Sequence, residues 1–311
     1  MLEPLYGTRN EGVLVKLAAA VAAAMDERAR QGSKGAAAGR LLATGAHWSV
    51  EDVVCTCTPD DRPFEEQHTG VAIAIVVAGT FQYRTTAGRA LMAPGSILLG
   101  NDGQCFRCSH EHAAGDRCAS FHFATDYFAA LAAHAGVRCP DVPFDSPRIP
   151  LSRSLAPLIA RARLRLASGA TDAIDDWNQL ATDLALGVVR LLASGQRAPR
   201  PALPVHERRV TELVRQIDER PAGVYTLDAL AQAADMSPFH FARIFQAVTG
   251  CSPHQYVMRL RLQHAADRLA ARSAKVLDVA LDAGFGDVSN FNHAFKREFG
   301  ASPRAFGPLR P

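Results

Sequence analysis

The chain has 311 residues, of which 48% are hydrophobic and 21% are charged. This is the composition of a globular protein; it excludes a disordered chain, and the length allows about two domains with separate cores. The net charge of +3 is uneven, because from residue 206 on 14 Lys and Arg accompany 11 Asp and Glu, whereas residues 1–205 hold 20 of each. A mildly basic C-terminal third is compatible with a polyanionic partner but is weak support for one by itself.

Residues 1–45 are predicted to form an N-terminal extension that includes the Ala-rich segment Gly12–Met25. This segment is too short to span a membrane, and Lys16 interrupts it, so a secretion signal is not favoured. It is either an amphipathic helix or an over-long predicted start of the chain. We therefore expect a cytoplasmic protein without a membrane partner, whose seven cysteines are reduced thiols.

Residues 46–193 are predicted to form a domain that begins with short strands and continues with helices. Val71–Val77 is a buried strand, Pro94-Gly95 is one of several turns, and Arg117–Phe123 is the last clear strand. Short strands separated this evenly by turns favour a β-sandwich or a small barrel over a parallel α/β sheet.

Two longer helices are expected near Ser154–Ala167 and Thr171–Ala193. The second carries a continuous apolar stripe at helical spacing, which either packs against the strand-rich part or forms a dimer interface. In the first helix Arg161, Arg163 and Arg165 alternate along the sequence. A helix spreads such residues over different faces, so a solvated surface is their expected role.

A Pro-rich linker at 194–205 separates this region from an all-α domain at 206–311. Between Thr226 and Phe306 one pattern occurs twice, fifty positions apart. The matched residues are Leu227 and Leu277, Phe241 and Phe291, Phe245 and Phe295, and Gly250 and Gly300. Each copy has a short helix, a turn, a second helix and a glycine stop, which predicts two helix-turn-helix units joined by a helix.

Local signals mark the ends of these helices. Thr226 and Ser237 are predicted N-caps, and Pro238 suits the first helical position. Gly284 is expected to end a helix in the left-handed conformation. The connecting helix after Cys251 is predicted to run about 19 residues, or roughly 28 Å. This length is close to the separation of about 34 Å between two major-groove sites on one face of DNA.

Each of the two predicted helix-turn-helix units contains a longer sequence motif. The motifs are Ser-Pro-Phe-His-Phe-Ala-Arg-Ile-Phe at 237–245 and Ala-Gly-Phe-Gly-Asp-Val-Ser-Asn-Phe-Asn-His-Ala-Phe-Lys-Arg-Glu-Phe-Gly-Ala-Ser-Pro at 283–303. Both resemble the signatures of AraC/XylS-type transcriptional regulators. The resemblance implies a sequence-specific DNA-binding regulator, and not an enzyme, that reads two adjacent major-groove segments of double-stranded DNA. It places the base-reading positions at Phe239, Ala242, Arg243, Val288, Ser289, Asn290 and His293. His240 and Lys296 complete the predicted DNA-binding set.

The side-chain chemistry agrees with this assignment. Arg243 suits a bidentate contact with guanine, Asn290 a pair of bonds with adenine, and Phe239 a thymine methyl group. His293 stands where the family often has arginine, so it donates to guanine without the bidentate fork. Three further cations are expected to meet phosphates: Lys296, Arg259 and Arg261.

The strand rhythm and the motif Ala93–Leu99 resemble the cupin-like effector domains that precede such DNA-binding modules. Cupin enzymes usually carry a His-x-His pair and a glutamate on an early strand and a later histidine. The corresponding residues here are, in chain order, Glu65, Glu66, His68, His110 and His112. This order is not the enzymatic one, so a cupin-type metal enzyme fused to a DNA-binding module is the weaker alternative.

Soft ligands suited to zinc or Cu(I) gather on one stretch: Cys105, Cys108, His110, His112 and Cys118. Cys55 and Cys57 join them if the sheets fold together. Three interpretations stay open, namely buried structural cysteines, a metal or thiol-redox sensor, and an organic-ligand pocket. No cofactor is expected to be required for DNA binding. The expected partners besides DNA are a small-molecule or metal effector, a second copy of the chain and, for an activator, RNA polymerase.

Overall fold

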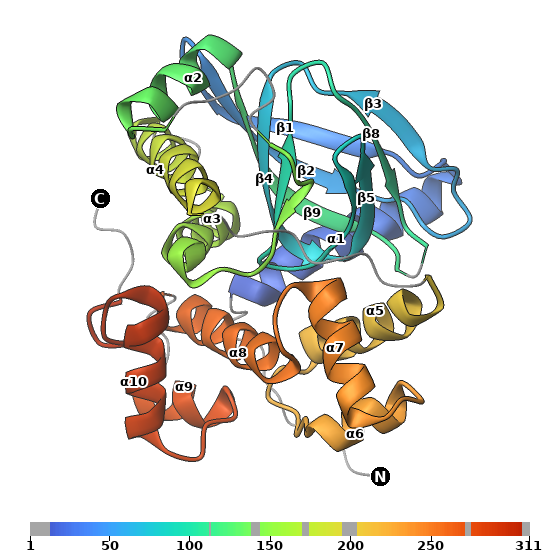
Figure 1. The fold of residues 1–311 in the computed structure, drawn as a ribbon, viewed down its shortest axis with the longest axis vertical. Helices are drawn as coiled ribbons and strands as arrows, with labels where there is room; N and C mark the ends of the chain where they lie inside the picture. Colours follow the sequence, from blue (N-terminus) through green and yellow to red (C-terminus); the bar gives the residue numbers. More distant parts are fainter. Residues whose placement is uncertain are drawn as a thin grey trace.

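The computed structural model describes residues 13–111, 113–137, 144–169, 174–194, 204–270 and 275–306. It contains a sheet domain with flanking helices and, in the described part of the C-terminal third, a domain made of helices (Figure 1). The predicted α+β fold with two domains is confirmed. No described helix is both long enough and apolar enough to cross a membrane.

Two antiparallel sheets face each other in the sheet domain. The six-stranded sheet has the order β1 (Ala37–Thr44), β2 (Trp48–Cys55), β9 (Asp116–Phe123), β4 (Val71–Gly79), β7 (Ile97–Gly100) and β10 (Arg148–Ile149). The four-stranded sheet has the order β3 (Phe64–Gln67), β8 (Cys105–Ser109), β5 (Phe81–Thr85) and β6 (Gly88–Met92). Alternate residues of β4 point to opposite faces, with Ile73 and Ile75 in one core and Ala74 and Val76 in the other. Burial on both faces explains the unbroken apolar run of this strand.

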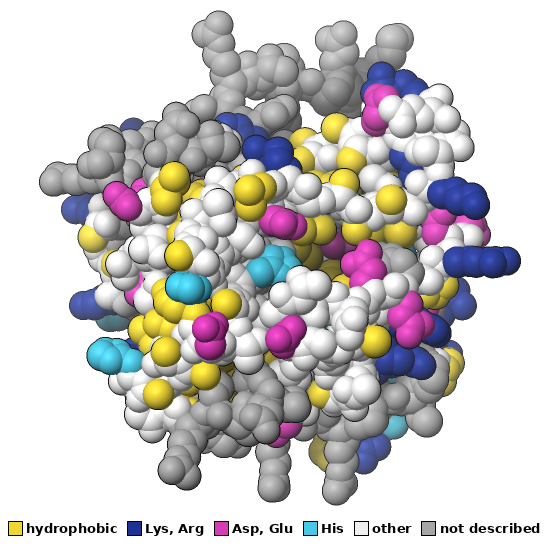
Figure 2. Space-filling view, turned by 90° about the horizontal axis from the view of Figure 1, so that it is seen from above, with side chains coloured by type: hydrophobic (Ala, Val, Ile, Leu, Met, Phe, Trp, Pro, Cys, Tyr) yellow, Lys and Arg dark blue, Asp and Glu magenta, His cyan; other side chains and the backbone are white. Residues whose placement is uncertain are grey.

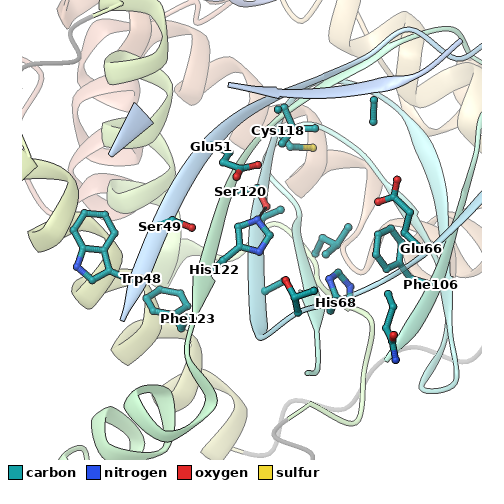
Figure 3. A pocket seen from close by; sticks show the side chains of 18 of the residues that line it. Trp48, Ser49, Glu51, Glu66, His68, Phe106, Cys118, Ser120, His122 and Phe123 are labelled. Atoms are coloured by element: carbon teal, nitrogen blue, oxygen red, sulfur yellow. Dashed lines mark hydrogen bonds between the residues drawn. The ribbon is translucent and has the colours of Figure 1, made fainter. Parts of the chain in front are cut away.

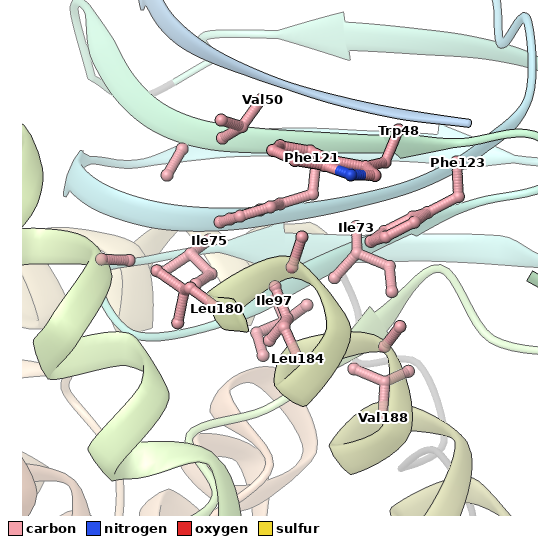
Figure 4. Close-up of a cluster of buried hydrophobic side chains, with 14 of the residues drawn as sticks. Trp48, Val50, Ile73, Ile75, Ile97, Phe121, Phe123, Leu180, Leu184 and Val188 are labelled. Atoms are coloured by element: carbon pink, nitrogen blue, oxygen red, sulfur yellow. The ribbon is translucent and has the colours of Figure 1, made fainter. Parts of the chain in front are cut away.

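Helices α2 (Thr125–His134), α3 (Ala156–Ser168) and α4 (Ile174–Ala193) contribute to the core on the outer face of the six-stranded sheet. Figure 4 shows Leu180, Leu184 and Val188 of α4 pointing toward Ile73 and Ile75 of β4. These three α4 side chains are 0% exposed. The apolar stripe therefore packs within the chain, and its alternative use as a dimer interface is not supported.

Helix α1 (Val13–Gln31) belongs to the sheet domain rather than to a separate extension. Leu17 and Val21 are buried, and the helix contacts β2, β4, β9 and α3 as well as the C-terminal domain. In Figure 1 it runs along the end of the sheet domain that faces the C-terminal helices. Strand β1 also pairs with β2 along its length. The predicted domain start at residue 46 is therefore too late.

The C-terminal domain has two small cores that share one helix. Its helices are α5 (Pro204–Glu219), α6 (Leu227–Ala233), α7 (Pro238–Thr249), α8 (Pro253–Ala270), α9 (Val276–Asp282) and α10 (Val288–Phe299). The helix α8 places Tyr256 and Leu260 in the first core, and Leu262 and Ala266 in the second. This confirms the prediction of two helical units joined by a single helix.

A buried ion pair joins the two domains. Arg163 of α3 and Asp267 of α8 lie 2.8 Å apart (Nη2 to Oδ2), and each side chain is 1% exposed. Nη1 of Arg163 also donates to the carbonyl oxygen of Val77 on β4, at 2.8 Å. A second contact between the domains is made by Arg148 of β10, which donates to the carbonyl oxygen of Val248 on α7 at 2.8 Å. The prediction that Arg163 is solvated is wrong, because α8 docks on the face of α3 that carries it.

Removing one partner of this pair is expected to destabilise the protein strongly. Arg163→Ala or Asp267→Ala leaves an unpaired buried charge, so either should lower the free energy of unfolding by about 3–5 kcal/mol. The double variant Arg163→Met/Asp267→Leu buries no charge and should cost less than either single change. Urea denaturation followed by the fluorescence of buried Trp177 measures all three.

The matched control is the exposed pair of Arg208 and Glu212 on α5. Arg208→Ala should change the stability by less than about 1 kcal/mol. A double apolar variant whose cost equals the sum of the two single costs would show that the pair is not coupled.

Candidate nucleic-acid interface and sheet-domain cavity

The first helix-turn-helix unit consists of α6, a turn and α7, and its helices are fixed by caps. The hydroxyl of Thr226 accepts from the Ala229 N–H at 3.1 Å, and that of Ser237 accepts from the His240 N–H at 3.4 Å. Asp235, in the turn, has φ +53°, a left-handed conformation that Asp adopts more readily than most residues. Both predicted N-caps are confirmed, so the start of α7 is set locally.

The second unit repeats this construction with α9 and α10. Gly284 ends the turn of α9 with φ +80°, as predicted. Asp287 caps α10 with both carboxylate oxygens, which accept from the N–H groups of Ser289 (3.0 Å) and Asn290 (3.1 Å). This cap was not among the predicted ones, although an aspartate directly before a predicted helix start is a standard N-cap signal.

The two second helices, α7 and α10, bury aromatic side chains and expose the predicted DNA-binding residues. Phe241 and Phe245 of α7 are 0% exposed, and so are Phe291 and Phe295 of α10. The exposed members of the predicted set are Phe239, Arg243, Ser289, Asn290, His293 and Lys296. Figure 1 shows α7 and α10 on either side of α8. Each helix therefore presents one face to solvent while the other anchors it.

Phe239 is the most unusual residue on this surface, because its side chain is 83% exposed. An exposed ring at the start of a helix is available to pack against an apolar group of a partner, such as the thymine methyl group expected from the sequence. Three other members of the set are partly covered: His240, Ala242 and Val288. The ring of His240 lies 5.1 Å from that of His206.

Two arginines that were predicted to meet phosphates are instead engaged within the chain. Arg261 donates to three carbonyl oxygens, those of Pro221 (2.9 Å), Gly223 (2.8 Å) and Gly284 (3.1 Å). Arg259 donates to the carbonyl oxygen of Leu151 and lies 3.7 Å from a carboxylate oxygen of Glu298. Arg261 thus ties the loop before α6 to the turn of the second unit. The bonds of Arg259 and Arg261 within the chain do not support their assignment to phosphates, whereas Lys296 is exposed.

The sheet domain contains a cavity of about 700 Å³ between its two sheets. Alternation along β2 and β9 directs one face of each strand into it: Ser49, Glu51, Ser120 and His122 line the wall that Figure 3 shows on the side of these strands. His68, Glu66 and Phe106 line the opposite side. Figure 2, seen from the sheet-domain end, shows a hollow with hydrophobic side chains in its floor and histidine and acidic side chains around it. A cavity of this size fits a small organic molecule.

The two cavity histidines are neutral hydrogen-bonding groups rather than charges. Burial lowers the pKa of His68 to about 4 and also lowers the pKa of His122. Nε2 of His68 lies 2.7 Å from the Tyr83 hydroxyl, which itself donates to the Leu99 carbonyl at 3.2 Å. His68 therefore donates through Nε2 and keeps Nδ1 as an acceptor. Nε2 of His122 lies 2.9 Å from the Ser120 hydroxyl. His122 was not among the predicted site residues, although the alternation of polar residues along β9 indicates it.

The structure does not bring the predicted cysteines and histidines together in one site. Cys105 is exposed on β8, whereas Cys108 and Cys118 are buried. His112 lies outside the described residues. His110 is buried, with Nε2 2.7 Å from a carboxylate oxygen of Asp116.

Two other cysteines lie with His110. The sulfur atoms of Cys55 and Cys57 and one ring nitrogen of His110 all lie within 4.8 Å of one another. All three residues are buried, and burial raises the pKa of both thiols above their usual value. As free groups, the thiols of Cys55 and Cys57 are therefore protonated at neutral pH.

The comparisons with known proteins concern the C-terminal domain. Residues 230–307 match the family described as a helix-turn-helix domain. The chain is 35% identical over 97 residues to the HTH-type transcriptional regulator MtrA of Neisseria gonorrhoeae, covering 31% of this chain and 32% of MtrA. It is 36% identical over 95 residues to the RCS-specific HTH-type transcriptional activator RclR of Escherichia coli (strain K12), covering 30% of this chain and 34% of RclR.

Among solved structures, the DNA-binding domain of AdpA, a global transcriptional factor in complex with a target DNA, is 30% identical. That match covers 32% of this chain and 88% of the AdpA domain, with a TM-score of 0.31. The matched segment spans about a third of the length of MtrA and of RclR. The likeness therefore concerns the C-terminal domain, where residues 230–307 match a helix-turn-helix domain and resemble part of named transcriptional regulators.

The free energy of unfolding is expected to fall as the pH drops from 6.5 to about 4, because the folded-state pKa of His68 is lowered from 6.5 to about 4. In this window the unfolded chain binds a proton at His68 that the folded chain does not, so acid favours unfolding. The change His68→Gln keeps a polar group beside Tyr83 and removes the titration. Urea denaturation at a series of pH values should then give a shallower dependence of stability on pH. If the slope of stability against pH is unchanged in His68→Gln, titratable groups other than His68 cause the loss of stability in acid.

Proposed function

We propose that the protein is a sequence-specific DNA-binding transcriptional regulator whose two helix-turn-helix units read adjacent major-groove segments. The observation that carries this proposal is the pair of helices α7 and α10. Each helix has an N-cap, buries phenylalanines on one face and exposes polar side chains on the other. Relatives that match this domain are named transcriptional regulators, which supports a regulatory rather than an enzymatic role.

The connecting helix α8 supports simultaneous reading by both units. It has 18 residues, which corresponds to about 27 Å at 1.5 Å per residue. Two major-groove sites on one face of DNA are about 34 Å apart, and slight bending of the duplex covers the difference. Because the ends of α8 are buried in separate cores, the helix is a fixed spacer between the two reading helices.

The two units are expected to read unlike sequences. The first presents Arg243, suited to guanine, and Phe239, suited to a thymine methyl group. The second presents Asn290, suited to adenine, and His293, a single donor for guanine. One chain therefore recognises an asymmetric site. Lys296 on α10 adds a phosphate contact, which positions the domain without specifying sequence.

We assign the cavity of the sheet domain to a small-molecule effector. Its volume, its neutral histidines and its apolar walls favour an uncharged or mixed polar and apolar ligand over a strongly anionic one. The catalytic alternative has less support, because Nε2 of His68 is hydrogen-bonded to Tyr83 and Nε2 of His122 to Ser120. The homodimer and the contact with RNA polymerase stay predictions.

Arg243→Ala is expected to weaken binding to a selected operator by about 1–3 kcal/mol and to leave binding to random duplex nearly unchanged. The operator is first selected from a pool of random duplexes with the full-length protein. Titrations of both duplexes by fluorescence anisotropy measure the two affinities. Equal losses on both duplexes would remove the base-reading role of Arg243.

Lys296→Ala is expected to weaken binding to all sequences alike and to reduce the slope of log Kd against log salt concentration by about one. Arg261→Met is the matched control, because its three carbonyl bonds lie within the chain. It should lower thermal stability and leave the salt slope unchanged. A reduced salt slope for Arg261→Met would instead indicate that Arg261 contacts a DNA phosphate.

A further inference from the structure

We propose that the sheet domain binds a thiophilic metal ion, Zn²⁺ or Cu⁺, through the sulfur atoms of Cys55 and Cys57 and Nδ1 of His110. This site differs from the cluster expected from the sequence, since it includes neither Cys105 nor Cys108. It does not depend on the proposed DNA-binding function.

The three donor atoms are already close to the separation that an ion requires. The two sulfur atoms and one ring nitrogen of His110 lie within 4.8 Å of one another. A tetrahedral zinc ion with bonds of about 2.3 Å to sulfur and about 2.0 Å to nitrogen holds its donors roughly 3.5–3.8 Å apart. Binding an ion therefore requires the donor atoms to move closer together by up to about 1 Å.

His110 has the hydrogen bonding of a metal ligand. Its Nε2 lies 2.7 Å from a carboxylate oxygen of Asp116, whereas its Nδ1 is buried without a hydrogen-bond partner. A buried polar atom left unpaired costs about 1–3 kcal/mol, so it calls for an explanation. Histidines that bind metals usually donate their other ring N–H to a carboxylate, which fixes the tautomer. Here the Nε2–H of His110 donates to Asp116, which leaves the lone pair of Nδ1 for an ion.

Strand register brings these residues together. Cys55, the last residue of β2, pairs directly with Asp116, the first residue of β9. The carbonyl oxygen of Cys57 accepts from the Gly115 N–H at 2.9 Å. Because Gly115 has φ +71° and a Cβ there would lie 2.7 Å from Val21, only glycine fits this close approach.

Helix α1 covers the site. Arg28 of α1 donates to the carbonyl oxygen of Thr56 at 2.5 Å and pairs with Asp61 at 2.8 Å, so the loop that carries Cys57 is tied to the helix. The side chain of His110 is 1% exposed. Helix α1 therefore closes the side of the site that lies away from the cavity.

The donor set determines the class of ion. Two thiolates and an imidazole are soft or borderline ligands, which select zinc or Cu⁺ over magnesium and calcium, since those prefer oxygen. Three protein ligands satisfy trigonal Cu⁺, whereas zinc takes a fourth donor. Cys55 and Asp116 also line the cavity, so the fourth position of a zinc ion is within reach of a solute in the cavity.

The test uses the full-length protein, purified without oxygen and stripped of metal with a chelator. Zn²⁺ and Cu⁺ are then titrated against chromophoric competitor ligands, and Co²⁺ serves as a spectroscopic substitute for zinc. We expect one ion per chain and a thiolate-to-cobalt charge-transfer band in the wild-type protein. The competition titrations decide between zinc and Cu⁺. A wild-type protein that shows neither stoichiometric binding nor the cobalt band overturns the proposal without any variant.

Variants then assign the ligands. Cys55→Ser/Cys57→Ser should lower the affinity at least about 100-fold, and Asp116→Asn should lower it about 10–100-fold while the cobalt band persists. Cys105→Ser, which changes an exposed cysteine of β8, is the matched control and should leave the affinity unchanged. Unchanged binding in the double variant overturns the site. So does a wild-type protein that binds no metal and instead forms a Cys55–Cys57 disulfide, detected by mass spectrometry.

Discussion

Helix α8 is packed from three directions, and the placement of both reading helices depends on that packing. Tyr256 lies in the core of the first unit and Ala266 in that of the second, while Asp267 is paired with Arg163 of the sheet domain. Taking two charges out of water costs several kcal/mol per ion, and only a short, well-aligned contact offsets that cost. The interface therefore tolerates few alternative arrangements, and α7 and α10 are held against a rigid axis.

The same arginine links the cavity of the sheet domain to the DNA-binding domain. Arg163 donates to the carbonyl oxygen of Val77 on β4, and Ala72 and Ala74 of that strand line the cavity. If the proposed effector favours a different position of β4, it acts on an acceptor of Arg163, and through Asp267 on α8. One hydrogen bond and one ion pair thus form a contiguous set of contacts through which binding in the cavity can be coupled to the reading helices.

The helical domain was largely predictable because its signals are local. An N-cap requires only a side chain and a backbone N–H within three residues, so Ser237 could be assigned from its neighbours, and Asp287 could have been. The sheet domain was predictable only in outline, since strand alternation identifies faces but not which faces meet. Arg261 shows the limit in the helical domain: its three acceptors come from two distant loops.

By itself, the sequence determined the two helix-turn-helix units, their phenylalanine cores and the outward residues of α7 and α10, because a helical period and local caps specify them. Tertiary structure alone decided which charged and sulfur-containing side chains are buried together. Arg163, which was expected on the surface, lies buried at the interface between the domains. Cys55 and Cys57, rather than Cys105, lie beside His110. The reason is that strand register and helix docking join residues far apart in the chain, and the packing of the whole core sets both.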